Sequence, residues 1–229
     1  MTASLQGCTL LLAGGTSLAG TVAARAALER GAHVVVAGRD PAKLAALAEE
    51  LPAVETAAVD LTDEAAVRAL AGGLRSVGTR VDGILHLVGG WRGGGGLAGQ
   101  SDEDFRFLER SLTALRHVTR AFDDDLRESD AARLAIVSST ALDRPLAGGA
   151  NYAAVKAASE AWTRAVAQGF AKAARDAGRP LEAASVIFRV KSLDGLEQIL
   201  AESFLGLFDA DAADVNDTVV TLGAEVDRA

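Results

Sequence analysis

Near its amino terminus the chain reads Thr9-Leu10-Leu11-Leu12-Ala13-Gly14-Gly15-Thr16-Ser17-Leu18-Ala19-Gly20. Its first five residues are typical of a buried strand, and the alanine-rich segment from Ser17 to Arg30 has the pattern of a helix. Glycines at such a junction let the backbone turn sharply and approach a pyrophosphate held by the free amides of the helix. The stretch favours a dinucleotide-binding turn, and a plain glycine-rich turn is the alternative, because a lone glycine pattern is weak evidence.

Short apolar runs alternate with longer segments of helical period along the whole chain, which is typical of repeated βα units around a parallel sheet. We expect strands at residues 9–13, 33–37, 55–59, 82–88, 133–138, 183–188 and 218–222. We expect helices at residues 17–30, 41–51, 63–74, 101–127, 151–177 and 196–207. The pattern predicts an α/β fold, with one doubly wound Rossmann-type domain over residues 1–229, a mostly parallel seven-stranded sheet and helices on both faces.

Composition narrows the class of partner. The chain has 229 residues, of which 49% are hydrophobic, so it can bury one large core. Its net charge of -8 would repel nucleic acid and anionic membranes across most of the surface. We therefore expect a small molecule or another protein as the partner, with no role for nucleic acid or a membrane.

Targeting and metal signals are weak. The apolar start from Met1 to Gly20 lacks a basic leader, and no apolar run reaches the ~18 residues needed to cross a bilayer. Cys8 is the only cysteine, so no internal disulfide can form. The three histidines, His33, His86 and His117, lack the spacing of metal ligands. We expect a cytoplasmic protein without a targeting segment or a metal site.

Arg39 closes the second expected strand, where dinucleotide sites select between cofactors. A guanidinium there can pair with a ribose 2′-phosphate, whereas NAD sites usually place a carboxylate that takes the 2′-hydroxyl. Arg39 therefore favours NADP, and the neighbouring Asp40 keeps NAD possible. The alternative interpretation is a solvated loop arginine.

Tyr152 and Lys156 stand four residues apart on an expected helix, which stacks the phenol and the ammonium on one face. Ser139 lies thirteen residues before Tyr152, at the end of an apolar run, and a strand ending there would bring a hydroxyl to the same point. Together the three predict a proton-transfer site. Taken alone, the Tyr-Lys pair is as readily an accident of an alanine-rich helix.

With these positions in place, the sequence resembles the short-chain dehydrogenase/reductase family over nearly its whole length. The matching features, in family order and spacing, are the glycine turn at 14–20, Asp60-Leu61 after the third strand, Gly89 after the fourth, Ser139, and Tyr152 with Lys156. The resemblance implies a reductase in which nicotinamide delivers hydride to a carbonyl carbon. Tyr152 would give a proton to the carbonyl oxygen, Ser139 would hydrogen-bond that oxygen, and Lys156 would lower the pKa of the phenol.

The resemblance also implies the cofactor contacts. Asp60 would meet the adenine amino group, Gly89 would let a cofactor ribose pass close to the backbone, and Lys156 would hold the nicotinamide ribose. The full expected cofactor set is Gly14, Thr16, Ser17, Leu18, Arg39, Asp60, Leu61, Val88, Gly89, Gly90, Tyr152 and Lys156.

Four departures from the family pattern bear on activity. Leu18 replaces the middle glycine and puts a bulky side chain where backbone normally approaches phosphate. His86 opens the His86-Leu87-Val88-Gly89 stretch where the family has Asn-Asn-Ala-Gly; it is either a packed strand histidine or a contact on the adenosine side. Ser111 is the nearest match to an asparagine whose backbone carbonyl holds a water that links the lysine to solvent. After the sixth strand the family's long substrate lid is missing, which leaves a shortened substrate region at about 189–207.

Our leading prediction is an NADP-dependent reductase of a ketone or aldehyde, with Ser139, Tyr152, Lys156 and Ser111 as the catalytic set. The alternative is a nucleotide-binding or interaction module with the same fold and little or no turnover. By resemblance, the two long helices at 101–127 and 151–177 would form the interface of a homodimer or homotetramer. The sequence does not name the substrate.

Overall fold

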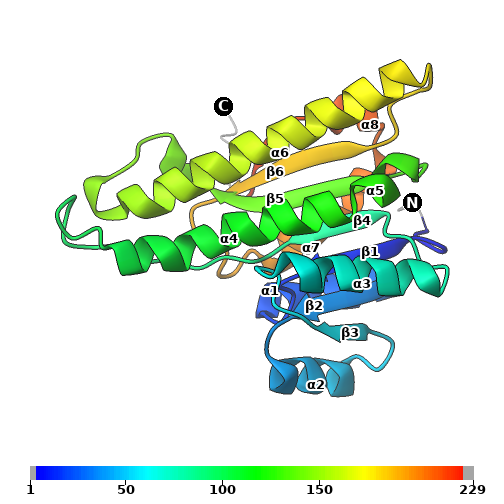
Figure 1. The fold of residues 1–229 in the computed structure, drawn as a ribbon, viewed down its shortest axis with the longest axis horizontal. Coiled ribbons are helices and arrows are strands. Elements are labelled where there is room, and N and C mark those ends of the chain that lie inside the picture. Colours follow the sequence, from blue (N-terminus) through cyan, green and yellow to red (C-terminus); the bar gives the residue numbers. More distant parts are fainter. Residues whose placement is uncertain (1–3, 224–229) are drawn as a thin grey trace.

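The computed structural model describes residues 4–223 and contains one seven-stranded sheet in the order β3-β2-β1-β4-β5-β6-β7 (Figure 1). Every neighbouring pair of strands is parallel. The strands are β1 (Thr9–Ala13), β2 (His33–Gly38), β3 (Glu55–Ala58), β4 (Gly83–His86), β5 (Arg133–Ser139), β6 (Ala184–Val190) and β7 (Val219–Thr221). This confirms the expected α/β fold; residues 1–3 and 224–229, the ends of the domain predicted over 1–229, lie outside the described range.

Helices cover both faces of the sheet (Figure 1). They are α1 (Leu18–Glu29), α2 (Pro41–Glu50), α3 (Glu64–Ser76), α4 (Asp102–Ala121), α5 (Asp123–Glu128), α6 (Ala150–Asp176), α7 (Glu197–Gly206) and α8 (Ala212–Val215). Within residues 4–223, none of these helices has the length and apolar character needed to span a membrane.

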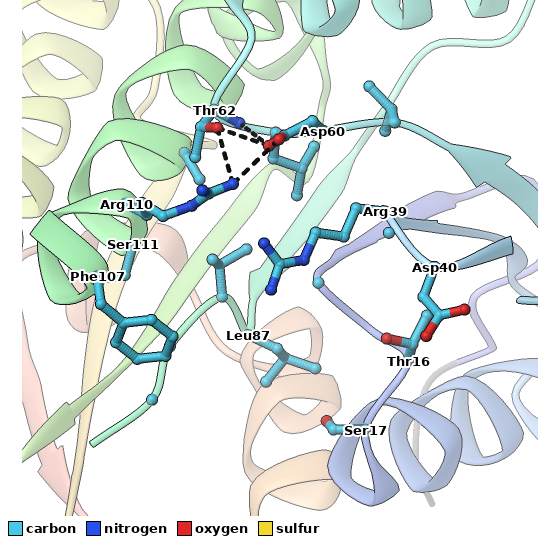
Figure 2. Close-up of a pocket in the computed structure, with 18 of the residues that line it drawn as sticks. Thr16, Ser17, Arg39, Asp40, Asp60, Thr62, Leu87, Phe107, Arg110 and Ser111 are labelled. Atoms are coloured by element: carbon cyan, nitrogen blue, oxygen red, sulfur yellow. Dashed lines mark hydrogen bonds and ion pairs between the residues drawn. The ribbon is translucent and has the colours of Figure 1, made fainter. Parts of the chain in front are cut away.

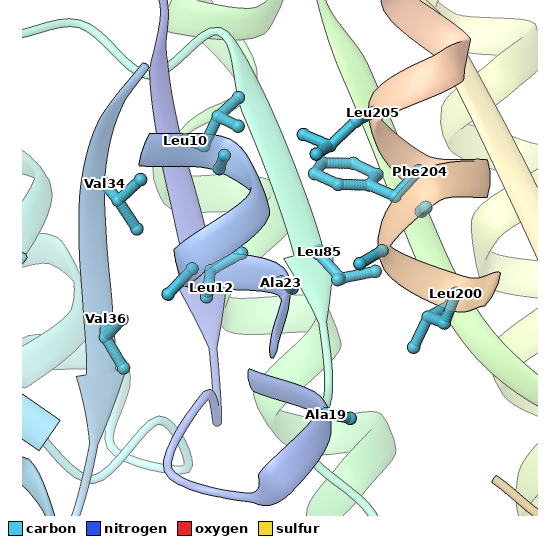
Figure 3. Packing of buried hydrophobic residues seen from close by; sticks show 14 of the residues in the cluster. Leu10, Leu12, Ala19, Ala23, Val34, Val36, Leu85, Leu200, Phe204 and Leu205 are labelled. Carbon is cyan, nitrogen blue, oxygen red and sulfur yellow. The ribbon is translucent and has the colours of Figure 1, made fainter. Parts of the chain in front are cut away.

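Two apolar layers hold the helices against the sheet. On one face, side chains of β1, β2 and β4 meet α1 and α7, as Figure 3 shows for Leu10, Leu12, Val34, Val36 and Leu85 packed against Ala19, Ala23, Leu200, Phe204 and Leu205. On the other face, the alternate strand residues pack against α3, α4, α5 and α6. Alternation of side chains along each strand thus produces a core on both sides.

Capping residues fix where the strands give way to helices. The carboxylate of Asp40 accepts the backbone amides of Ala42 and Lys43 at the start of α2, at 3.0 and 3.2 Å. Asp63 caps α3 in the same way, and the Ser101 hydroxyl accepts the amide of Asp104 at the start of α4. Such caps satisfy amides that have no partner within the helix. They place each helix start close to the carboxyl edge of the sheet.

One expected helix is wrong in its extent. The sequence pattern predicted a continuous helix over 101–127, but the chain bends at Phe122 and divides it into α4 and α5. Phe122 is fully buried, and the bend turns the Asp125 carboxylate inward, where it accepts a hydrogen bond from Arg75 Nε at 2.7 Å. The acidic run Asp123–Asp125 is therefore buried at its last residue.

The strand order places a crevice next to β1. This strand lies between β2 and β4, so the chain changes direction across the sheet when it passes from β3 to β4. Loops leaving β1 and β4 diverge at such a point, and ligands of doubly wound sheets bind outside these carboxyl ends. The glycine turn after β1 and the segment after β4 lie at this edge.

Candidate active site

The turn between β1 and α1 is built on glycines that have no room for a side chain. Gly14 has a φ of +80°, and a Cβ there would lie 2.8 Å from Val88 Cγ2. A Cβ on Gly20 would lie 2.0 Å from the carbonyl oxygen of Gly15. A tight four-residue turn therefore separates the strand from the helix, whose first amides lie at the crevice edge.

A cleft of about 380 Å³ runs along this edge, between the ends of β1, β2 and β4 and the side of α4 (Figure 2). Ten of the residues expected from the sequence line it: Gly14, Thr16, Ser17, Arg39, Asp60, Leu61, Val88, Gly89, Gly90 and Ser111. Others that the sequence reasoning did not single out also line it, among them Lys43, Thr62, Phe107 and Arg110. Lys43 and Arg110 are exposed helix residues whose role depends on the tertiary structure, so no local pattern marks them.

Asp60 is held firmly on one side of the cleft. Its Oδ1 accepts the backbone amide and the hydroxyl of Thr62 at 2.9 and 2.7 Å, and its Oδ2 accepts Arg110 Nη2 at 3.1 Å. The Thr62 hydrogen bonds, followed by the charge of Arg110, hold the pKa of the Asp60 carboxyl below its usual range. The side chain is therefore a fixed, ionised acceptor.

Arg39 and Asp40 occupy different surroundings at the end of β2. Figure 2 shows the guanidinium of Arg39 projecting into the cleft between Asp60 and Leu87. Among residues 4–223, Arg39 makes no hydrogen bond or ion pair, and its charge contributes to the lowered pKa of Asp60. In contrast, one carboxylate oxygen of Asp40 accepts the backbone amides that start α2. The free cation at this position is the arginine.

Ser139, Tyr152 and Lys156 come together beyond the end of the cleft where Gly89 lies, although none of the three lines it. Ser139 ends β5, and its hydroxyl oxygen accepts the amide of Ala141 at 3.1 Å. Burial raises the pKa of the Tyr152 phenol, and a hydrogen bond with the Ser139 side chain acts in the opposite direction. The Lys156 ammonium lies 5.8 Å from the centre of the Tyr152 ring.

The Lys156 side chain extends from α6 to β5 and to the segment that follows β4. Its Nζ donates to the carbonyl oxygen of Val137 at 2.7 Å, and a Cβ on Gly89 would lie 3.8 Å from the same nitrogen. Burial lowers the pKa of Lys156 to about 8, against the opposing charge of Glu160. Gly89 lines the cleft, so this contact joins the cleft to the Tyr-Lys-Ser cluster.

Residues 9–174 match the family model for short chain dehydrogenases, which covers well over half of the chain. The chain belongs to the short chain dehydrogenase family. Membership assigns it to the NAD(P)-dependent oxidoreductases. A search of curated proteins found no significant match.

Solved structures with the same fold include several short chain dehydrogenases. One from Pseudomonas syringae is 22% identical with a TM-score of 0.83, covering 96% of this chain and 98% of that one. A gluconate 5-dehydrogenase from Burkholderia cenocepacia, in complex with NADP and tartrate, is 20% identical with a TM-score of 0.81, covering 96% and 94%. The NADP complex of RhlG from Pseudomonas aeruginosa is 20% identical with a TM-score of 0.81, covering 96% of each chain. At these identities the likeness shows the fold alone.

Leu18 lies at the start of the first helix of this dehydrogenase, where the sequence analysis placed it. It is the first residue of α1, its side chain is 66% exposed, and it is absent from the lining of the cleft. The side chain therefore does not line the cleft, and the crowding of a phosphate at the start of α1 stays a prediction. Ser17, which caps α1 through the amide of Gly20 at 3.4 Å, lines the cleft instead.

His86 and Ser111 are joined in this dehydrogenase. His86 ends β4, is buried, and places its Nε2 3.2 Å from the backbone carbonyl oxygen of Ser111 on α4. The packed interpretation of His86 is therefore correct. The carbonyl expected to hold a relay water accepts from an imidazole, which a reading of the sequence alone did not foresee.

The glycine-rich loop after β4 is tied to the segment that precedes α6. The amide of Gly94 donates to the carbonyl oxygen of Gly148 at 2.7 Å, and the Gln100 amide donates to Gly94, Gly96 and Gly148. Gln100 Oε1 also accepts the amide of Asn151, next to Tyr152. This loop thus has a defined connection to the helix that carries the phenol. The connection between β6 and α7 is short, as expected, and spans residues 191–196.

Proposed function

We propose that this dehydrogenase binds NADPH in the cleft and reduces a ketone or aldehyde to an alcohol, with Tyr152 as the proton donor. The observation that carries the proposal is the convergence of Ser139, Tyr152 and Lys156 at the end of a cleft built on a glycine turn. When bound, NADPH supplies the hydride. The close packing at Gly14 and Gly20 suits the approach of a pyrophosphate.

The charges at the adenosine end of the cleft support NADP over NAD. Arg39 has no partner among residues 4–223, and Lys43, whose amide bonds the neighbouring Asp40, also lines the cleft, so two cations are available for a 2′-phosphate. Asp40 is the carboxylate that would take a 2′-hydroxyl in NAD, but it caps α2. Two structural relatives, the gluconate 5-dehydrogenase and RhlG, were crystallised with NADP.

Tyr152 and Ser139 have complementary parts in the proposed reaction. The raised pKa of the buried phenol keeps Tyr152 protonated at neutral pH, as a proton donor requires. The oxygen of Ser139 accepts the Ala141 amide, and its O–H, which bonds the Tyr152 side chain, can turn to donate to a substrate oxygen. A substrate oxygen between the two hydroxyls would receive a hydrogen bond from Ser139 and the proton from Tyr152.

Lys156 makes the phenol able to release its proton. A positive charge near the phenol stabilises the phenolate that forms as the proton leaves. The hydrogen bond to Val137 keeps the ammonium in place. Residues 191–196 are too few to form a long lid over this point, and the proposed substrate region is therefore short and open.

The proposal can be tested by fluorescence titration with NADPH and NADH, followed by NADPH consumption on a panel of ketones and aldehydes. We expect NADPH to bind at least ~10-fold more tightly than NADH, and Arg39→Ser to remove most of the difference. Binding of NADPH without consumption on any carbonyl would favour the rival, a nucleotide-binding module of the same fold. Equal affinity for the two cofactors would contradict the choice of NADP.

Assembly is a separate part of the proposal. The helices α4 and α6 pack on each other along one face of the sheet (Figure 1). We propose that their outer surfaces form the interface of a homodimer or homotetramer. Light scattering of the purified protein would test it, and a monomer at micromolar concentration would contradict it.

A further inference from the structure

A buried imidazole with an unused nitrogen lies within the electrostatic influence of Lys156. His86 is only 5% exposed, and its Nε2 is 3.2 Å from the carbonyl oxygen of Ser111. Its Nδ1 is buried and has no hydrogen-bond partner among residues 4–223. Buried polar atoms are nearly always paired, because desolvation without a partner is costly. The unpaired nitrogen therefore points to a contact that the protein makes when it works.

The contact at Ser111 determines the protonation of the ring. A carbonyl oxygen only accepts, so the hydrogen must be on Nε2, and Nδ1 is left as a bare acceptor. Burial lowers the pKa of His86 to about 4, so the ring is uncharged at neutral pH. His86 thus offers one acceptor site and no charge.

Lys156 is the group suited to use this acceptor. Its ammonium carries three hydrogens, and its one hydrogen bond among residues 4–223 goes to Val137. The strand register places His86 opposite Ile136, the residue before Val137, and the charge of Lys156 acts on the imidazole.

Within the described range 4–223, the neighbours of His86 on the adjoining elements do not compete for this contact. The strand neighbours of His86, Ala13 on β1 and Ile136 on β5, are apolar. On α4, Arg110 is committed to Asp60. On α6, Glu160 lies one turn beyond Lys156 and favours its charged form.

We propose that His86 is a positioning residue that accepts a hydrogen bond at Nδ1 from the Lys156 ammonium, directly or through one water, and ties it to the backbone of Ser111. The proposal rests on the proposed function, in which Lys156 serves Tyr152. When Tyr152 has given its proton to the substrate oxygen, a Lys156 N–H bond breaks to restore the phenol, and the amine then takes a proton from water. His86 stays neutral throughout and stabilises the ammonium form, because a hydrogen bond to a charged donor is strong.

The contact can be tested without a substrate. The chain has three histidines, so two-bond ¹H–¹⁵N spectra of the imidazoles are simple to assign with a His86→Asn variant. We expect His86 to be the Nε2–H tautomer, with an Nδ1 resonance displaced by hydrogen bonding, and Lys156→Met to return that resonance to the value of a free nitrogen. Lys191→Met, at an exposed position, is the matched control and should leave it unchanged. An Nδ1–H tautomer, or an Nδ1 resonance unaffected by Lys156→Met, would overturn the proposal.

Kinetic measurements test whether His86 affects turnover through Lys156. The probe reaction is NADPH consumption with the best carbonyl of the panel, measured from pH 6 to 10. His86→Leu removes the acceptor, so we expect kcat to fall about 10-fold, KM to change less than about 2-fold, and the alkaline fall in rate to move about one pH unit lower. His86→Asn, which keeps an acceptor and a donor, should recover most of the shift.

A wild-type pH profile in folded His86→Leu would overturn the proposal, since a purely structural residue would change stability and leave the profile in place. Tyr152→Phe separates this outcome from failure of the proposed function. If Tyr152→Phe keeps full activity, the proposed function fails, and the tautomer and the Lys156→Met shift still decide the contact of His86.

Discussion

Arg189 holds both oxygens of the buried Glu160 carboxylate, with Nε 2.8 Å from Oε1 and Nη2 2.7 Å from Oε2. Glu160 also accepts the hydroxyl of Ser138 at 2.7 Å, and Arg189 Nη1 donates to Asp143 at 2.8 Å. The pair thus joins α6, β6, the end of β5 and the loop that follows it. Ser138 directly precedes Ser139, so this network fixes the backbone that presents the proposed oxyanion partner.

Breaking this network should affect both stability and turnover. Glu160→Gln removes the charge that satisfies a largely buried guanidinium, so we expect the free energy of unfolding to fall by about 3 kcal/mol. We expect kcat to fall by a larger factor than the Kd for NADPH rises, because Glu160 and Arg189 do not line the cofactor cleft. Urea denaturation and cofactor titration check this. The matched control is Glu202→Gln on the exposed side of α7, which should change stability by less than about 0.5 kcal/mol.

The pH dependence of carbonyl reduction should follow Lys156. Its folded-state pKa of about 8 lies below the ordinary value, so its charge is present below pH 8 and is lost above it. The Tyr152 phenol has a raised pKa and stays protonated over this range. We therefore expect kcat/KM to be level below about pH 8 and to fall above it. Lys156→Arg keeps its charge at all these pH values and should abolish the fall; the same fall in that variant would assign it to another group.

His86 should make the protein less stable in acid. Its folded-state pKa of about 4 lies below the ordinary value of about 6.5, so between these values the unfolded chain binds a proton that the folded chain does not. Stability therefore rises with pH across this window and is lost on acidification, by about 2 kcal/mol between pH 7 and pH 5. Urea denaturation of His86→Asn should show a pH dependence that is shallower by this amount. An unchanged slope would mean that the ring ionises freely in the fold.

Leu18 should be neutral for cofactor binding. Its side chain lies in solvent outside the cleft, so we expect Leu18→Gly to change the Kd for NADPH by less than about 2-fold. The glycine should lower helix stability by less than about 1 kcal/mol. Gly14→Ala is the contrasting variant, because the new Cβ would meet Val88 in a backbone conformation that alanine avoids. It should abolish binding, and a large gain in affinity for Leu18→Gly would restore the crowding interpretation.

Strand and helix order could be predicted because local signals agreed with the fold. Apolar runs such as Thr9–Ala13, and capping residues such as Asp40 and Asp63, mark elements without reference to the rest of the chain. The bend at Phe122 could not be predicted in this way. It depends on the burial of Phe122 and the inward turn of Asp125 toward Arg75, and Arg75 lies 50 residues away in sequence.

In the candidate site, too, local sequence signals predicted some residues, whereas others depend on tertiary packing. Tyr152 and Lys156 were found from their spacing on one helix, and Ser139 from its place at the end of a strand. In contrast, the contact between His86 and Ser111 joins β4 to α4, and that between Glu160 and Arg189 joins α6 to β6. These pairs become visible only when the helices are packed on the sheet. The exposed direction of Leu18 likewise follows from the geometry of the turn and not from residue size.

The most direct test of the account is the single-turnover oxidation of NADPH by the wild-type protein and by Tyr152→Phe with the same carbonyl substrate. Loss of a positioned general acid should slow the step by at least about 100-fold, while the Kd for NADPH stays within about 2-fold of the wild-type value. A Tyr152→Phe variant that oxidises NADPH at the wild-type rate would contradict Tyr152 as the proton donor.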